Sequence, residues 1–167
     1  PVARLFAAAL VCSYFLLSTQ SFAQVFETKA KQALVMDYDS GTILFQKKAD
    51  ELIPPASLAK LMTMEVVFNA LKRGRLTMED TFTISEDAWR RGGANSGGSS
   101  MFAKLNSDVR LEDLIRGVIV QSGNDAAIAI AEGMAGSEVA FAGLMNQRAR
   151  KIGLEISNFR NSTGLPD

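Results

Sequence analysis

A serine and a lysine stand three residues apart in a stretch that is otherwise largely apolar. Ser57 and Lys60 follow two prolines, and the residues up to position 71 are mostly leucine, methionine, valine and alanine. On a helix, residues at this spacing share one face, with β-carbons about 5–6 Å apart. A serine hydroxyl is a poor nucleophile until a base takes its proton, and a lysine can do so where burial favours its neutral form. The spacing therefore indicates a pair capable of acyl transfer.

The same pair has a purely structural interpretation. Serine is common at helix starts as a cap, and a Ser-x-x-Lys match carries weight only in the right structural context. Two features favour catalysis: an unpaired charge on Lys60 would be costly in an apolar stretch, and the proline pair places Ser57 where a cleft can open. The chain contains no histidine, which excludes a Ser-His-Asp triad within it.

A second polar element interrupts the apolar segment between residues 111 and 134. Ser122-Gly123-Asn124 forms the break. A hydroxyl there can relay a proton to a leaving amine, and an amide can orient Lys60 and a substrate carbonyl. The alternative is an ordinary turn between helices, with Asn124 or Asp125 as the cap of the second helix.

The elements that must position these residues are a hairpin followed by a block of helices. Residues 33–38 and 42–46 are predicted to be strands, with Gly41 in the turn between them. Helices are expected over residues 57–71, 111–120, 125–134 and 137–152. The first is apolar almost all round and is expected at the centre of the domain. In the last, the residues expected to face inward are Val139, Phe141, Leu144, Met145 and Ile152.

The two polar elements together resemble a known family. Ser-x-x-Lys followed by Ser-x-Asn is part of the motif set of penicillin-binding proteins and class A β-lactamases. Residues 55–63, Pro-Ala-Ser-Leu-Ala-Lys-Leu-Met-Thr, resemble the active-site helix of the D-alanyl-D-alanine carboxypeptidases, which are low-molecular-mass penicillin-binding proteins. Residues 114–126 are similar to their second motif. Further similar stretches are residues 98–102, 141–146 and 161–165.

The resemblance implies an enzyme that removes the terminal D-alanine of peptidoglycan stem peptides through an acyl-enzyme. It implies Ser57 as the nucleophile, Lys60 as the general base and Ser122 as the proton relay. The residues expected to contact the substrate are Asn124, Ser99 and Ser100. β-Lactam antibiotics are expected to acylate the same serine. No metal or organic cofactor is implied, and the net charge of zero gives no sign of a nucleic-acid partner.

The third motif of the set, Lys-Thr-Gly, does not occur in this sequence. In the family it lines the cleft opposite the serine and supplies one oxyanion-hole amide. We therefore expect an α/β (α+β) penicillin-binding/β-lactamase-like transpeptidase fold, with the N-terminal hairpin and helical subdomain present and the C-terminal strands missing. Because losing one oxyanion donor costs about a hundredfold or more in rate, residues 24–167 alone are expected to be inactive, and poorly folded without those strands.

Three other interpretations stay open from the sequence. A class A β-lactamase shares the nucleophile and the lysine, although it usually carries aspartate where this chain has Gly123. A module that binds muropeptides or β-lactams without turnover would keep the same motifs. In a purely structural helical domain, Ser57 and Asn124 would only cap helices.

The first 23 residues have the features of a secretory signal. Residues 2–17 are nearly all apolar, with Arg4 near their start, and Ser21-Phe22-Ala23 places small residues at the first and third positions. We expect cleavage after residue 23 and an exported catalytic part over residues 24–167, in the periplasm or at the outer face of the cytoplasmic membrane. An uncleaved anchor is the alternative. Many relatives end in an amphipathic anchor, so the resemblance leaves open peripheral membrane association through a segment beyond this sequence.

Overall fold

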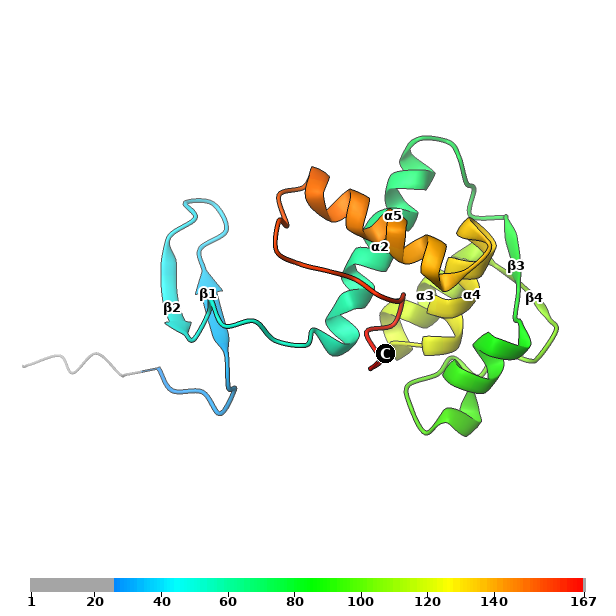
Figure 1. Ribbon diagram of the computed structural model, residues 1–167, viewed down its shortest axis with the longest axis horizontal. Coiled ribbons are helices and arrows are strands. Elements are labelled where there is room, and N and C mark those ends of the chain that lie inside the picture. Colours follow the sequence, from blue (N-terminus) through cyan, green and yellow to red (C-terminus); the bar gives the residue numbers. More distant parts are fainter. Residues whose placement is uncertain (1–25, 167) are drawn as a thin grey trace, which may run out of the picture. The chain divides into compact units, whose positions relative to one another are not determined.

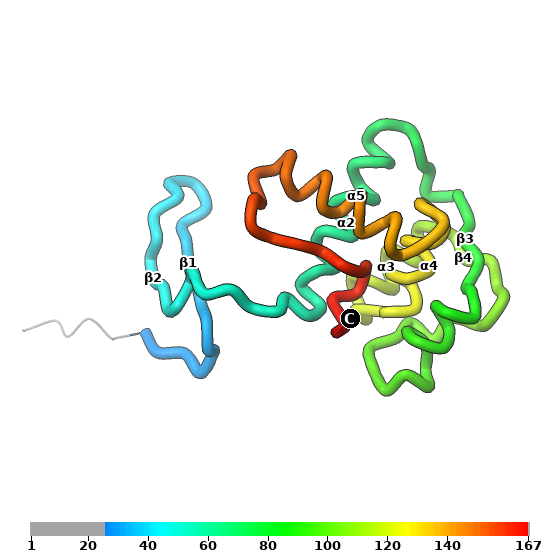
Figure 2. Tube along the Cα trace, viewed as in Figure 1, coloured from blue at the N-terminus to red at the C-terminus, as the bar shows by residue number. Residues whose placement is uncertain are grey.

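The computed structural model describes residues 26–166, and the chain divides after residue 52 into two compact units. The elements follow one another from a hairpin to a helical block, as Figures 1 and 2 show. The predicted signal segment, residues 1–23, lies outside the described residues. The order of hairpin and then helices agrees with the sequence-based expectation.

The first unit is a β-hairpin. Strand β1 (Ala33–Met36) pairs antiparallel with β2 (Ile43–Lys47). The hydroxyl and backbone N–H of Ser40 donate hydrogen bonds to the Asp37 carboxylate and lower its pKa, and Gly41 takes a left-handed φ of 69°. These contacts close the predicted turn. Most apolar side chains of the two strands are exposed: Leu34, Val35, Met36, Ile43 and Leu44.

The second unit is a helical block with α4 (Asn124–Ala135) at its centre. Its other elements are η1 (Ala56–Leu58), α2 (Ala59–Lys72), β3 (Thr81–Thr83), η2 (Ala88–Gly92), η3 (Ala94–Ser96), β4 (Asp108–Arg110), α3 (Leu111–Gln121) and α5 (Glu138–Lys151). The first eight residues of α4 are all buried, and the helix contacts η2, α3, α5 and β3. Gly92 of η2 permits a close approach to this helix, since a β-carbon there would lie 2.2 Å from the backbone nitrogen of Asp125. This rigid centre carries one half of the candidate site.

The four predicted helices are confirmed, with ends within two residues of those expected. The short antiparallel sheet of β3 and β4 was not predicted, because strands of three residues are too short to show an alternating pattern. Among residues 26–166, no single helix is long and apolar enough to cross a membrane; α4 and α5 meet that test together, by length and composition only, as a pair bent by 85°.

The inward face predicted for α5 is partly wrong. Phe141 and Met145 are fully buried, as expected. The three other predicted positions are exposed: Val139, Leu144 and Ile152. The buried face instead repeats every four residues through Phe141, Met145 and Ala149, which is the spacing of one helix face.

The expectation that α2 is buried at the centre of the domain is only partly confirmed. Its buried residues include Lys60, Thr63 and Val67. A stripe of exposed apolar side chains runs along the remaining face: Leu58, Leu61 and Phe68. Within the described residues α2 is therefore buried on most sides and open on one.

Candidate active site

The Ser57 hydroxyl and the Lys60 amine meet at the start of α2. Two prolines precede them, and proline is well tolerated at a helix start. Ser57 lies in η1 and is exposed, whereas Lys60 lies in the first turn of α2 and is only 4 % exposed. Lys60 Nζ lies 3.2 Å from Ser57 Oγ and donates a hydrogen bond to it. An exposed hydroxyl beside a buried amine is suited to a serine nucleophile with a lysine base.

The surroundings of Lys60 favour its neutral form. Burial lowers its pKa below the ordinary lysine value, because the protein interior solvates the charged form poorly. Its second hydrogen-bond acceptor is the backbone carbonyl of Thr163, also at 3.2 Å. Among residues 26–166, no carboxylate forms an ion pair with Lys60 that would offset this desolvation. The amine can therefore accept a proton at a lower pH than an exposed lysine.

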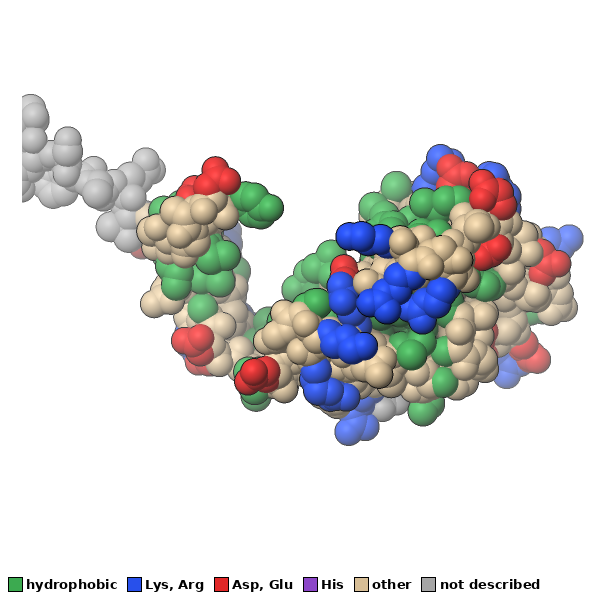
Figure 3. All heavy atoms as spheres, turned by 90° about the horizontal axis from the view of Figure 1, so that it is seen from above, with side chains coloured by type: hydrophobic (Ala, Val, Ile, Leu, Met, Phe, Trp, Pro, Cys, Tyr) green, Lys and Arg blue, Asp and Glu red, His purple; other side chains and the backbone are tan. Residues whose placement is uncertain are grey.

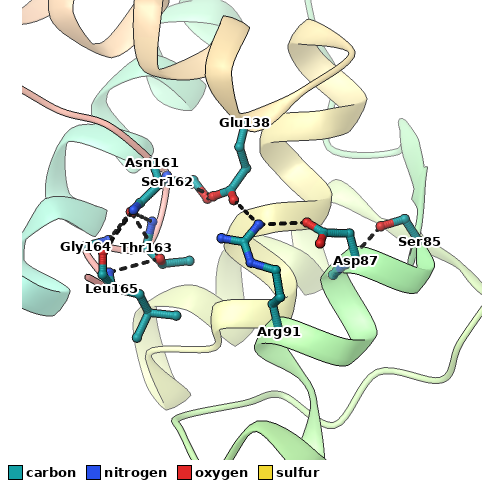
Figure 4. A network of polar contacts seen from close by, with 10 residues as sticks. Ser85, Asp87, Arg91, Glu138, Asn161, Ser162, Thr163, Gly164 and Leu165 are labelled. Atoms are coloured by element: carbon teal, nitrogen blue, oxygen red, sulfur yellow. Dashed lines mark hydrogen bonds and ion pairs between the residues drawn. The ribbon is translucent and has the colours of Figure 1, made fainter. Parts of the chain in front are cut away.

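The Thr163 carbonyl is held in place by contacts within residues 161–165 and from α2. Asn161 Oδ1 accepts hydrogen bonds from the backbone N–H groups of Thr163 at 3.2 Å and Gly164 at 2.7 Å, as Figure 4 shows. The Thr63 hydroxyl donates to the Ser162 carbonyl at 2.7 Å. Since Thr63 lies one turn after Lys60, α2 contacts the same segment at both positions.

Glu138 ties this segment to the helical block. Its Oε1 accepts hydrogen bonds from the backbone N–H and hydroxyl of Ser162, at 3.0 and 2.5 Å. Its Oε2 pairs with Arg91 of η2 at 2.7 Å, and Arg91 also pairs with Asp87 at 2.8 Å (Figure 4). This network could not be predicted from the sequence, because its members lie far apart in the chain.

Substituting Gly164 with alanine is expected to destabilise the protein by at least about 1–2 kcal/mol, which is the cost of the left-handed backbone alone, and to move the Thr163 carbonyl. Gly164 has a φ of 76°, and a β-carbon there would lie 1.8 Å from the Ala56 carbonyl oxygen. Thermal unfolding of the whole protein measures the effect. Gly143→Ala is the matched control, because a β-carbon at that exposed position of α5 meets nothing within 4 Å. Equal unfolding temperatures for the two variants would contradict the prediction.

The second predicted element joins the end of α3 to the start of α4. Ser122 takes a left-handed φ of 54° at the end of α3, a conformation uncommon for a residue with a β-carbon. The backbone N–H of Asn124 donates to the Ser99 carbonyl at 2.9 Å. The side-chain oxygen of Asn124 is buried without a hydrogen-bond partner among the described residues. Such an atom is free to accept a hydrogen bond from a lysine or a substrate.

Asp125 holds this element against the loop before it. The sequence suggested Asn124 or Asp125 as the cap of α4, and Asp125 Oδ1 does accept the backbone N–H of Ala126 in the first turn at 3.0 Å, although the N-cap position itself is Gly123. The fully buried Asp125 carboxylate also accepts hydrogen bonds from Ser100 Oγ at 2.9 Å and from the backbone N–H groups of Met101 at 2.9 Å and Ala103 at 3.1 Å. The sequence feature that could have indicated this role is an acidic residue, Asp125, in the first turn of an apolar, alanine-rich helix. The Ser100 hydroxyl thus donates its hydrogen bond to Asp125, and its contact with a substrate stays a prediction.

The predicted site residues thus form two groups within the helical unit. Ser57 and Lys60 meet through a direct hydrogen bond, and Asn124 meets Ser99 through its backbone. In the described part of the chain, no hydrogen bond joins the Ser122 or Asn124 side chain to Lys60. Among residues 26–166, no group of three or more histidine, cysteine or acidic side chains is placed to hold a metal ion.

Comparison with known proteins identifies the family. The family model of the D-alanyl-D-alanine carboxypeptidases (Peptidase_S11) matches residues 18–167. The chain is similar to D-alanyl-D-alanine carboxypeptidase DacC of Escherichia coli K12, with 45 % identity over 90 % of this chain and 39 % of the relative. It is also similar to DacF of Bacillus subtilis, with 37 % identity over 83 % of this chain and 34 % of the relative. The chain therefore spans less than half the length of these relatives.

Solved structures agree with this assignment. The chain resembles penicillin binding protein 5 from Haemophilus influenzae, with a TM-score of 0.78 and 43 % identity over 85 % of this chain and 41 % of that one. It also resembles the D-alanyl-D-alanine carboxypeptidase DacD from Francisella tularensis, with a TM-score of 0.76 and 41 % identity over 85 % of this chain and 33 % of that one. The predicted mixed fold class is confirmed. By sequence and by fold, this chain belongs to the D-alanyl-D-alanine carboxypeptidase family.

Proposed function

We propose that the protein containing this chain is a serine-type D-Ala-D-Ala carboxypeptidase that removes the terminal D-alanine of peptidoglycan stem peptides. The observation that carries the proposal is the contact between an exposed Ser57 hydroxyl and a buried Lys60 amine at 3.2 Å. Family membership adds the substrate class, since the relatives are named for this activity. β-Lactam antibiotics are proposed as ligands of the same serine, because structural relatives are named penicillin-binding proteins.

The proposed reaction has two steps on Ser57. In the first, Lys60 takes the hydroxyl proton as Ser57 Oγ attacks the carbonyl between the two D-alanines. The bond to the last D-alanine then breaks, and its amine leaves with a proton relayed through Ser122. In the second step, water attacks the ester and releases the shortened peptide. The unpartnered Asn124 Oδ1 is proposed to hold the substrate and Lys60, with further contacts from Ser99 and Ser100.

The rival functions are less well supported. The sequence relatives described above are carboxypeptidases by name, which does not favour a class A β-lactamase. A binding module without turnover would not require the lowered pKa of Lys60, since an ordinary ammonium group could hold an anionic ligand equally well. We propose further that residues 1–23 are a signal segment and that residues 24–167 belong to an exported catalytic domain.

Mass spectrometry of the whole protein tests these proposals together. After incubation with penicillin, we expect one adduct per molecule on the peptide containing Ser57, and a synthetic pentapeptide ending in D-Ala-D-Ala should lose one alanine. The mass of the exported protein should lack residues 1–23. Labelling without alanine release would indicate a binding module, and rapid penicillin turnover without a lasting adduct would indicate a β-lactamase. An adduct on another serine would refute the assignment of Ser57.

A further inference from the structure

A cavity of about 310 Å³ opens in the helical unit, away from the candidate active site. Its walls come from the C-terminal halves of α2 and α5 and the last turn of α4. Ser57 lies before α2, whereas the lining residue Arg73 follows its last residue. Because a helix rises 1.5 Å per residue, roughly 20 Å separates the two positions along the helix. The cavity is therefore a second site rather than part of the Ser57 site.

The cavity has an apolar floor and a cationic rim. The apolar lining residues are Val66, Ala70, Leu76, Met134 and Leu144. The cationic ones are Arg73, Arg75, Arg148 and Lys151. Lys and Arg side chains gather on the face of the helical unit that Figure 3 shows. The chain as a whole has no net charge, so this is a local concentration of positive charge.

Three of the four rim cations are uncompensated within the structure. Arg148 pairs with Glu65, at 2.7 Å from its Nε. In the described part of the chain, the side chains of Arg73, Arg75 and Lys151 make no ion pair or hydrogen bond. The C-terminal ends of α2, α4 and α5 also reach the cavity, and each contributes about half a negative charge. Three full positive charges exceed these helix-end charges by roughly a factor of two, so a positive field remains.

We propose that this cavity binds a phosphate group attached to an apolar moiety. The guanidinium groups of Arg73 and Arg75 can hold phosphate oxygens in a bidentate manner, and Lys151 adds a third charge. Concave sites with an apolar floor and a few polar groups are typical of small-ligand sites, and the volume lies at the lower end of their usual range. Either a phospholipid headgroup with the start of its chains or a soluble phosphate ester has this chemistry.

The test measures binding by isothermal titration calorimetry on the whole protein. The probes are dihexanoyl phosphatidylglycerol below its micelle concentration, hexyl phosphate and inorganic phosphate, with dihexanoyl phosphatidylcholine as the zwitterionic comparison. We expect saturable binding of the first two and at least about tenfold weaker binding of the last two. Preference for the phosphatidylglycerol indicates a lipid source, and equal binding of hexyl phosphate indicates a soluble ester.

Paired variants separate this cavity from general surface charge. Arg73→Gln combined with Arg75→Gln is expected to weaken binding at least about tenfold. The matched control is Lys72→Gln combined with Arg150→Gln, which removes two exposed charges close in sequence to the rim but outside the cavity lining. All four side chains are exposed, so both variants are expected to fold. Equal weakening in the two variants, or no saturable binding of any phosphate probe, would overturn the proposal.

Discussion

Replacing Lys60 with methionine is expected to slow acylation of Ser57 by about a hundredfold to ten-thousandfold, which is the usual contribution of general base catalysis. The lysine amine lies 3.2 Å from the hydroxyl that it must deprotonate. Burial holds its pKa below the ordinary lysine value, so a neutral amine is available to act as the base. Methionine keeps an unbranched apolar side chain at this buried position but cannot accept a proton.

The pH dependence of acylation provides a second test of the same role. The rate in the parent protein is expected to rise as Lys60 loses its proton, with a midpoint below the pKa of a free lysine side chain. The Lys60→Met variant should lose this rise. The measurement is the second-order rate constant for labelling by a fluorescent penicillin, taken across the pH range in the whole protein. Lys72→Met, at the exposed end of the same helix, is the control and should keep both the rate and the profile.

The same substitution is expected to leave stability at neutral pH equal or higher. The unfolded chain binds the Lys60 proton more tightly than the folded protein, since burial lowers the folded pKa. The resulting cost to stability is fully present below the folded pKa and disappears as pH rises through the ordinary lysine value. Methionine removes this cost, although it also leaves the Thr163 carbonyl without its donor. Unfolding of the Lys60→Met variant at neutral pH would contradict this stability prediction.

The local part of the site could be predicted from the sequence, and the long-range part could not. Ser57 and Lys60 are three residues apart, so helix geometry alone brings them together. The carbonyl that accepts the second hydrogen bond from Lys60 belongs to Thr163, 103 residues further along the chain. The Glu138 contact with Ser162 spans 24 residues between a helix start and an irregular segment. Neither contact follows from a repeating pattern, because each depends on how the helices pack.

In the fold, too, local features could be predicted from the sequence and long-range packing could not. Gly41 between two short apolar stretches predicts the hairpin, and the long apolar stretches predict the helices to within two residues. Burial was predicted less well, because a chain of apolar residues does not reveal which helix face meets a neighbour. Val139 is apolar but 81 % exposed, whereas Asp125 is charged in character yet fully buried. Both errors arise from tertiary packing that overrides the preference of the single residue.

Replacing Asp125 with alanine is expected to destabilise the protein by about 3–5 kcal/mol, the largest effect on stability that we predict for a single side chain. The change would leave the Ser100 hydroxyl and the backbone N–H groups of Met101 and Ala103 without their acceptor. Each polar group buried without a partner costs about 1–3 kcal/mol. Asp125→Asn should cost less because it keeps one acceptor oxygen, but it should still destabilise the protein because its amide nitrogen cannot accept the remaining hydrogen bonds.

The Asp125 substitutions also test whether this side chain positions the second half of the site. The loop that it anchors includes Ser99, whose carbonyl accepts the backbone N–H of Asn124. In Asp125→Asn, we therefore expect acylation to slow while the pH midpoint set by Lys60 is unchanged, because the base itself is untouched. Urea unfolding and penicillin labelling of the whole protein provide the two measurements. Asp113→Ala, which removes two solvent-exposed ion-pair contacts with Arg110 and Arg116, is the control and should alter stability by no more than about 1 kcal/mol. If Asp125→Ala unfolds within about 1 kcal/mol of the parent, the buried carboxylate does not hold the loop, and the order of this half of the site must come from the packing of α3 against α4.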